Sequence, residues 1–375
     1  MRGSRHRLDA VAQDRSDSFP YAAALVISGA ALFVFDSLNM SCIICESMYT
    51  PFNKVESTGG MFMKKLGLAA AILFLAIGLI GCPGQGERIR FATGGVAGTY
   101  YPFGTAIAAV LSERLGLSII VQSSGASMAN IQLIQEGQVE MALVQNDVMD
   151  YAWRGEELFA GRQFQGFRTV AALYPEVCQI VALPEITSIA ELRGRHVSVG
   201  AAGSGTEFNA MQILAAHGIT FADINVHNLG FGDSATALRD GMIDAAFVTA
   251  GAPTPAIVEL AIGRPITILP VDPAAAAQLI ADFPFYAMYT IPAGTYSGIN
   301  HDIVTVAVKA TLIVSEHLSE ETVYRMTRGL FEYRDAIALG HARGHDIDLE
   351  YAVQGVTVPF HPGAVRFFRA MGVME

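Results

Sequence analysis

Residues 88–103 have the sequence RIRFATGGVAGTYYPF, and this stretch determines the class of fold. Its first five residues are typical of a buried β-strand, the glycines after them indicate a tight turn, and apolar residues recur at helical spacing from Phe103 onward. A similar design begins at residue 195, with a predicted strand at 195–199 and the glycine-rich turn GAAGSGT at 200–206 before a predicted helix. Strands that alternate with helices in this way predict an α/β fold with mainly parallel sheets.

A second pair of matching segments has nearly the same separation along the chain. Residues 136–145 are EGQVEMALVQ and residues 240–249 are DGMIDAAFVT, so each has an acid and a glycine before an apolar run that ends in a polar residue. Two matches at nearly one offset predict two lobes of similar plan. We expect lobe 1 to contain residues 82–174 and a return at 289–375 with C-terminal helices, and lobe 2 to contain residues 175–288.

Two segments are expected to connect the lobes, because each is extended in character and carries a proline. They are residues 171–176 and residues 287–292. After the second segment the sequence predicts helices at 304–314 and 320–339, and we expect these helices to pack on lobe 1.

The composition favours a large folded body and argues against a nucleic-acid partner. Apolar residues make up 52% of the chain and charged residues 16%, which is typical of a chain with a substantial core and not of a disordered one. The formal net charge of −11 would repel a phosphate backbone.

The residues before position 82 are predicted to lie outside the folded body. Residues 61–81 have a basic start, a short apolar core and small residues at the end, which are the parts of an export signal peptide. The ending LIGC at 79–82 resembles a bacterial lipoprotein cleavage box, in which Cys82 becomes the lipidated first residue, and a plain membrane anchor is the alternative. We interpret residues 1–60 as upstream sequence translated from a misassigned start, with a real second hydrophobic segment as the alternative.

Several short blocks, spread in order over almost the whole of the remaining chain, resemble the TAXI family, the solute receptors of one class of TRAP transporter. The blocks are TGGVAGTYYP at 93–102, LVQND at 143–147, AALYPE at 171–176, GSGTE at 203–207, PTPAI at 253–257, TIPAGTY at 290–296 and PFHPGA at 359–364. The resemblance implies a two-lobed α/β protein with the type II periplasmic-binding-protein fold and a ligand cleft between the lobes. It also implies a membrane transporter as partner, driven by an ion gradient, and glutamate or a related dicarboxylate as the ligand. A lipid anchor at Cys82 departs from many members of the family and would tether this periplasmic receptor to the membrane.

Candidate ligand-binding residues lie in the glycine-rich turns and at the ends of strands. Open α/β sheets bind ligands beyond the carboxyl ends of their strands, where the following helices offer free N–H groups and a partial positive charge that suit a carboxylate. The residues that we expect to contact the ligand are Thr93, Gly98, Thr99, Tyr100, Asn130, Gln145 and Tyr174 in lobe 1 and Ser204, Thr206 and Thr249 in lobe 2. For each of them an ordinary turn, cap or packing role is the alternative. No arginine lies within these turns, so an arginine clamp on a carboxylate is not expected.

Enzymatic readings of the sequence have less support. His341 and His345 have metal-ligand spacing without an evident third ligand, and neither a Gly-x-Ser-x-Gly turn nor a Gly-Lys-Ser/Thr phosphate loop occurs. The sequence therefore predicts a receptor that needs no cofactor and no metal. An enzyme on the same fold, or a sensory or surface-interaction protein, is the alternative.

Overall fold

The computed structural model describes residues 26–28, 31–33 and 88–375 of the chain. The chain divides into two compact units, Met1–Gly81 and Cys82–Glu375. In the first unit, β1 (Val26–Ser28) pairs antiparallel with β2 (Ala31–Phe33). The predicted signal peptide at 61–81 and Cys82 lie outside the described residues, and so does most of the segment 1–60. Of the helices in the described part of the chain, none has the length and apolar character needed to span a membrane.

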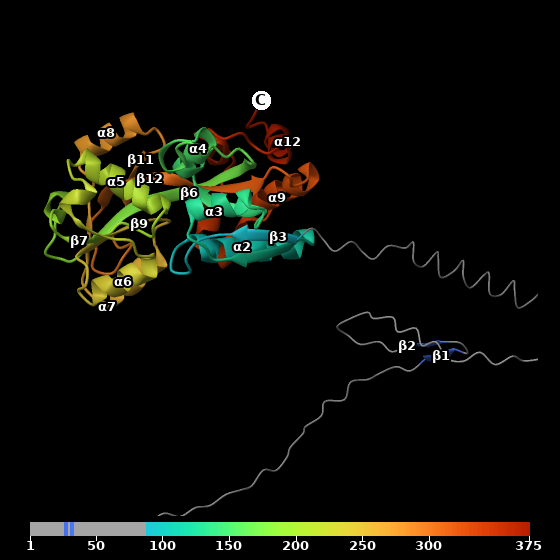
Figure 1. The fold of residues 1–375 in the computed structure, drawn as a ribbon, viewed down its shortest axis with the longest axis horizontal. Coiled ribbons are helices and arrows are strands. Elements are labelled where there is room, and N and C mark those ends of the chain that lie inside the picture. Colours follow the sequence, from blue (N-terminus) through green and yellow to red (C-terminus); the bar gives the residue numbers. More distant parts are fainter. Residues whose placement is uncertain (1–25, 29–30, 34–87) are drawn as a thin grey trace, which may run out of the picture. The chain divides into compact units, whose positions relative to one another are not determined.

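The first half of the sheet in the second unit, which we call lobe 1, contains three parallel strands and one antiparallel strand. Figure 1 labels β3 and β12 of this half. Their order is β4 (Ser118–Gln122), β3 (Arg88–Ala92), β5 (Met141–Gln145) and β12 (Ile303–Ser315). Strands β3, β4 and β5 are parallel to one another, and β12 runs antiparallel to β5.

The second half of the sheet, which we call lobe 2, repeats this order. It consists of β8 (Asn225–His227), β7 (His196–Ser198), β9 (Ala245–Ala250) and the long strand β6 (Phe167–Ala182). Here β7, β8 and β9 are parallel and β6 runs antiparallel to β9. The predicted fold class, a two-lobed α/β protein of the type II periplasmic-binding-protein kind, is confirmed.

Helices follow the parallel strands in both lobes. After β3, β4 and β5 come α2 (Tyr100–Leu115), α3 (Ser127–Gln135) and α4 (Asn146–Arg154), and after β7, β8 and β9 come α5 (Gly205–Ala216), α6 (Phe231–Arg239) and α7 (Pro255–Gly263). The remaining elements are α8 (Pro273–Asp282), α9 (Glu320–Glu332), α10 (Arg334–Gly340), α11 (Leu349–Val353), α12 (Pro362–Ala370), the short strands β10 (Thr267–Leu269) and β11 (Ala287–Ile291), and the 3-10 turns η1 (Glu157–Phe159), η2 (Ile189–Leu192), η3 (Phe221–Asp223) and η4 (Ala342–Asp346). The amino ends of the first six helices therefore lie at the carboxyl ends of strands, where a ligand site is expected.

Strands β6 and β12 run through both lobes and pair with each other over most of their length. Residues of β6 up to Tyr174 and of β12 from Ala310 onward belong to the hydrophobic clusters of lobe 1. Residues of β6 from Val177 and of β12 up to Val308 belong to the clusters of lobe 2. The chain thus passes between the lobes along these two strands, whereas residues 287–291 form β11, which pairs with β12. The bounds given above for the lobes stay a prediction.

One helix prediction is wrong and one is confirmed. Residues 304–314 belong to strand β12, whose side chains are buried on both faces, so that its apolar run has no strand-like alternation. The run is rich in Val, Ile and Thr, which favour strands. The helical prediction for 320–339 is confirmed by α9 and α10, which pack on α2 of lobe 1.

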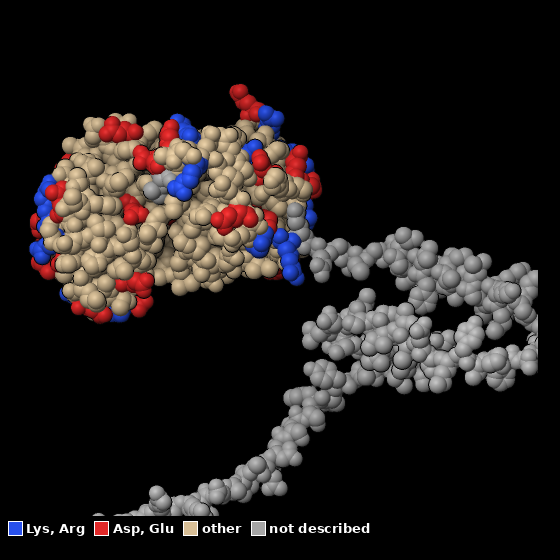
Figure 2. All heavy atoms as spheres, in the orientation of Figure 1, with Lys and Arg blue, Asp and Glu red and all other residues tan. Residues whose placement is uncertain are grey.

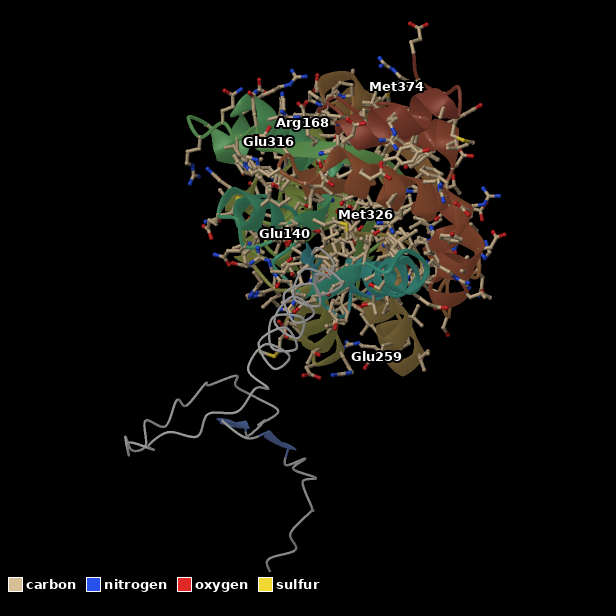
Figure 3. The ribbon with its side chains drawn as sticks, turned by 90° about the vertical axis from the view of Figure 1, so that its right-hand side faces the viewer. Glu140, Arg168, Glu259, Glu316, Met326 and Met374 are labelled. Atoms are coloured by element: carbon tan, nitrogen blue, oxygen red, sulfur yellow. The ribbon has the colours of Figure 1, made fainter. Side chains whose placement is uncertain are left out.

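Charged side chains are sparse on the surface, as the low share of charged residues indicates. Most of the face in Figure 2 is neither acidic nor basic. Arg168, which precedes the predicted crossing segment at 171–176, pairs with Glu316 at 2.8 Å, and Figure 3 shows the two side by side.

Candidate ligand-binding pocket

A cavity of about 300 Å³ is lined by residues of both lobes. Its walls are formed by residues 94–100, 124–127 and Gln145 of lobe 1, by Glu176 of β6, and by Ala201 and residues 204–206, 230–233 and 249–250 of lobe 2. The two glycine-rich turns that the sequence predicts to face each other both contribute to it. The cavity is therefore an interlobe site of the kind in which this fold encloses small molecules.

Four helix N-termini open into this cavity. The first residues of α2, α3, α5 and α6, which are Tyr100, Ser127, Gly205 and Phe231, all line it. In α2, α3 and α6 the residue before the helix makes no side-chain capping bond, whereas Ser204 caps α5 by accepting from the Glu207 N–H. Three of these helices thus keep first-turn N–H groups free of a side-chain cap, and their dipoles make the cavity attractive to an anion.

The lining residues include two carboxyl groups, Glu176 and Asp233, and no lysine, arginine, histidine or cysteine in the part of the chain that the structure describes. Hydroxyl groups, backbone amides and small residues form most of the remaining wall. The cavity therefore has hydrogen-bond donors without a fixed positive side chain.

Backbone strain occurs at the edge of the cavity. Ala126, the residue before α3, has φ 66 and ψ −146, a conformation that residues other than glycine rarely adopt. Residues in such conformations are concentrated at functional sites, where surrounding structure holds them in place.

The structure places seven of the predicted residues in the lining. These are Gly98, Thr99, Tyr100, Gln145, Ser204, Thr206 and Thr249. Only part of this set has free polar groups, because several hydroxyls are already engaged with protein atoms.

Thr93, Asn130 and Tyr174 do not line the cavity. Thr93 donates to the Gln122 carbonyl at 2.8 Å, and the Asn130 amide donates to the Thr93 and Leu143 carbonyls at 2.6 and 2.7 Å. These bonds tie together the carboxyl ends of three strands. Tyr174 is fully buried and its ring lies edge-on to that of Phe103, with centroids 5.3 Å apart. In this structure Thr93 and Asn130 are thus engaged in hydrogen bonds with the backbone, and the Tyr174 ring packs in the core of lobe 1.

Direct contacts join the lobes on one side of the cavity. The Thr99 hydroxyl donates to the Gly251 carbonyl at 3.0 Å, and the Ala256 N–H donates to the Ala97 carbonyl at 3.1 Å. Thr99 therefore already makes a bond across the lobes that does not need a ligand.

A buried polar network joins the lobes on the other side. The Gln145 amide donates to the Asn209 Oδ1 at 3.0 Å, and the Asn209 amide donates to Asp147 Oδ2 at 2.9 Å and to the Tyr286 hydroxyl at 2.7 Å. Burial raises the pKa of Asp147 to about 6. Gln145 Oε1 is buried without a hydrogen-bond partner among the described residues, pressed against Gly205. The lobes are thus closed directly on each other.

Glu176 is a buried acid in the lining that was not predicted from the sequence. It lies in the middle of β6, is 2% exposed, and accepts a hydrogen bond of 2.6 Å from the Tyr100 hydroxyl. Burial raises the pKa of Glu176 to about 8, against the lowering effect of the Tyr100 bond, and burial likewise raises the pKa of Tyr100. The signal in the sequence was an acidic residue inside a mostly apolar strand, because a buried acid is costly unless it has a partner or a function.

Ser124, Ser127 and Asp233 are further lining residues that were not predicted. The Ser127 hydroxyl accepts from the Gln145 N–H at 3.0 Å, and Ser124 donates to Asn130 Oδ1 at 2.5 Å. They follow β4 or begin α6, so the same strand-end argument that selected the other turns applies to them.

A model of the NMT1-like family matches residues 91–372. Among solved structures, a protein from Bordetella bronchiseptica is 16% identical over 77% of this chain and 89% of its own, with a TM-score of 0.48. The periplasmic aliphatic sulphonate binding protein of Escherichia coli is 14% identical over 77% and 80% of the two chains, with a TM-score of 0.40. The GluR0 ligand-binding core of Nostoc punctiforme, in complex with L-glutamate, is 14% identical over 69% and 99%, with a TM-score of 0.43.

Proposed function

The chain belongs to the NMT1-like family, and we propose that it is an extracytoplasmic solute receptor for a small anionic metabolite. In this proposal the receptor encloses the ligand between its lobes and delivers it to the membrane subunits of a transporter. Glutamate or a related dicarboxylate is the proposed ligand, and a TRAP-type transporter driven by an ion gradient is the proposed partner.

The convergence of four helix N-termini on one interlobe cavity carries this proposal. Such N-termini bind carboxylates and phosphates through free N–H groups and the helix dipole, without a cationic side chain.

The size of the cavity supports a small metabolite. Its volume of about 300 Å³ is at the lower end of the roughly 300–1,000 Å³ of small-molecule sites. Closure of the two lobes would bury such a ligand almost completely, and the ligand would stabilise the closed state by its contacts with both lobes.

An enzyme is a weaker candidate. The described lining residues supply no histidine, cysteine or lysine, and the Ser204 hydroxyl is engaged as a helix cap. The carboxyl groups of Glu176 and Asp233 could serve as bases, but no hydrogen bond from a lining serine or threonine hydroxyl to either carboxyl is found among the described residues.

The choice of a TRAP-type partner, glutamate-like ligands and lipid anchorage at Cys82 rests on the sequence blocks that resemble the TAXI family. Under this proposal the mature receptor begins at Cys82 and is tethered to the outer face of the cytoplasmic membrane. Its acidic ligand would then be captured near the transporter.

The test is to recover the ligand and to measure its binding. Residues 83–375 are purified without denaturation, then unfolded, and the released small molecules are identified by mass spectrometry. Calorimetric titration with L-glutamate, glutarate and the recovered molecule follows. We expect a carboxylate with micromolar or tighter affinity, recovered chemically unchanged after incubation. Recovery of a converted product would favour an enzyme, and a cationic or neutral ligand would contradict the proposal.

A further inference from the structure

Glu176 occupies a particular place in the fold, at the passage between the lobes. It lies on β6 opposite Val308 of β12, between the hydrophobic clusters of lobe 1 and lobe 2. Its carboxyl group lines the cavity, and Oε2 accepts from the Tyr100 hydroxyl at 2.6 Å. No other hydrogen bond to this carboxyl is found among the described residues, so Oε1 is available to a bound molecule.

The groups that face Glu176 offer no positive charge. The titratable groups whose charge interacts with Glu176, or which line the cavity with it, are Tyr100 of α2, Asp147 of α4, Tyr174 and Cys178 of β6, Tyr351 of α11 and Asp233 of α6. All of these are acids. Desolvation is the largest cause of the raised pKa of Glu176, and the charge of Asp147 acts in the same direction.

The cations on neighbouring elements have other partners. The Lys309 amine of β12 donates to the Gln354 carbonyl at 2.6 Å and lies 4.0 Å from the centre of the Tyr351 ring. The Arg343 guanidinium of η4 pairs with Asp346 at 2.8 Å. Neither is available to neutralise an ionised Glu176.

An ionised Glu176 and an anionic ligand in one enclosed cavity would repel each other strongly, because the low dielectric of the interior leaves the repulsion unscreened. A neutral carboxyl group has the opposite effect. It can accept from Tyr100 on one oxygen and donate its own proton from the other, which fits the single donor that the protein supplies.

On the basis of the proposed function, we propose that Glu176 binds the ligand in its protonated form and donates a hydrogen bond to a ligand carboxylate. When Glu176 is ionised before binding, one proton from solvent enters with the anion, and the same proton leaves when the ligand is released. Glu176 is thereby a specificity residue that favours anions and makes their capture dependent on proton uptake.

The test compares two probes that differ by one amino group, glutarate and L-glutamate. Binding is measured by calorimetry between pH 7 and pH 9.5, above the titration of Asp147. We expect the affinity for glutarate to be constant up to about pH 8 and then to fall about tenfold per pH unit, because only the protonated form binds. Titrations at pH 9 in two buffers of different ionisation enthalpy should show uptake approaching one proton. This uptake is measured on the wild-type protein and does not depend on a variant that folds.

Two variants sharpen the test. Glu176→Gln keeps a donor and an acceptor without a charge, so it should bind glutarate at pH 9.5 at least tenfold more tightly than the wild type and lose the pH dependence. Glu259→Gln removes an exposed acid, 82% exposed in its side chain, and should leave the pH profile unchanged. A glutarate affinity that stays flat to pH 9.5 would overturn the inference. The inference would also be overturned if the affinity for L-glutamate rose with pH in the wild type and if Glu176→Gln no longer bound L-glutamate. An ionised Glu176 would then hold the ammonium group.

Failure of the inference can be told apart from failure of the proposed function. If neither probe binds, the proposed ligand class is wrong, and the protonation of Glu176 is decided separately by infrared difference spectra of the wild type against Glu176→Gln. A carboxylic-acid band at pH 7 that the variant lacks supports a neutral Glu176. Carboxylate bands alone would refute it.

Discussion

Replacing Gly205 by alanine should weaken ligand binding by blocking closure of the lobes. A Cβ at Gly205 in lobe 2 would lie 1.3 Å from Oε1 and 2.4 Å from Cδ of Gln145 in lobe 1. Both distances are far below any real contact, so Gln145 has to turn its amide away. That movement breaks its 3.0 Å bond to Asn209, which is buried.

The magnitude follows from this lost hydrogen bond. Leaving a buried donor or acceptor without its partner costs about 1–3 kcal/mol, which corresponds to an affinity loss of roughly 5- to 150-fold. Lobe 2 by itself should not be destabilised, because the backbone at Gly205 is outside the left-handed region and alanine is a better helix former than glycine by up to about 1 kcal/mol.

The assay is calorimetric titration with the ligand recovered from the protein, together with thermal melts of the empty protein. Gln145→Ala serves as the matched background, because it removes the atoms that the new methyl group would strike. We expect Gly205→Ala to weaken binding in the wild type and to have little effect in the Gln145→Ala background, with a coupling energy of about 1–3 kcal/mol. Equal losses in both backgrounds, or a lowered melting temperature with unchanged affinity, would refute closure through this contact.

Three further predictions concern the lobes and the N-terminus. Thr99→Ala should weaken binding by about 0.5–1.5 kcal/mol, since it removes the Thr99–Gly251 bond of the closed form, and Thr99→Ser should restore the affinity. Burial raises the pKa of Asp147 from 3.8 to about 6, so its contribution to stability is full below pH 4 and is lost as the pH rises through 6. The unfolding free energy of Asp147→Asn should therefore change by roughly 3 kcal/mol less than that of the wild type between pH 4 and pH 7. Denaturant titrations at these two pH values measure the difference, and an unaltered pH dependence would contradict it. Cys82→Ala should release the protein from membranes, as seen by fractionation, whereas persistent anchoring would indicate an uncleaved helix.

The sequence allowed the overall fold to be predicted because the relevant signals are local. Each of these signals occupies a stretch of only about ten residues. They are the glycine-rich turns after β3 and before α5, and the repeated segments that end in Gln145 and Thr249. Strand β12 was mistaken for a helix because burial on both faces removes the period-two pattern.

The candidate site was predicted only in part, since partners far apart in sequence decide it. Thr99 lies at the expected strand end, but its bond to Gly251 crosses 152 positions of the chain. Tyr174 and Glu176 are two residues apart on one strand but have different surroundings. Tyr174 packs against Phe103 in the core, whereas Glu176 lies at the cavity and is hydrogen-bonded to Tyr100.

Whether helix N-termini hold an anion between the lobes can be measured by comparing the ligand affinities of Thr206→Asp and Thr206→Asn. Thr206 lines the cavity in the first turn of α5, and these two side chains have nearly the same shape and differ in charge. A new negative charge about 5 Å from an anionic ligand, at an effective dielectric constant of about 20, costs about 3 kcal/mol, or more than 100-fold in affinity. Because Thr206 is only 4% exposed, thermal melts of the two empty variants measure separately what the buried charge does to folding. We expect at least 100-fold weaker binding for Thr206→Asp than for Thr206→Asn, and equal or tighter binding for Thr206→Asp would show that the N-terminus of α5 does not hold an anion.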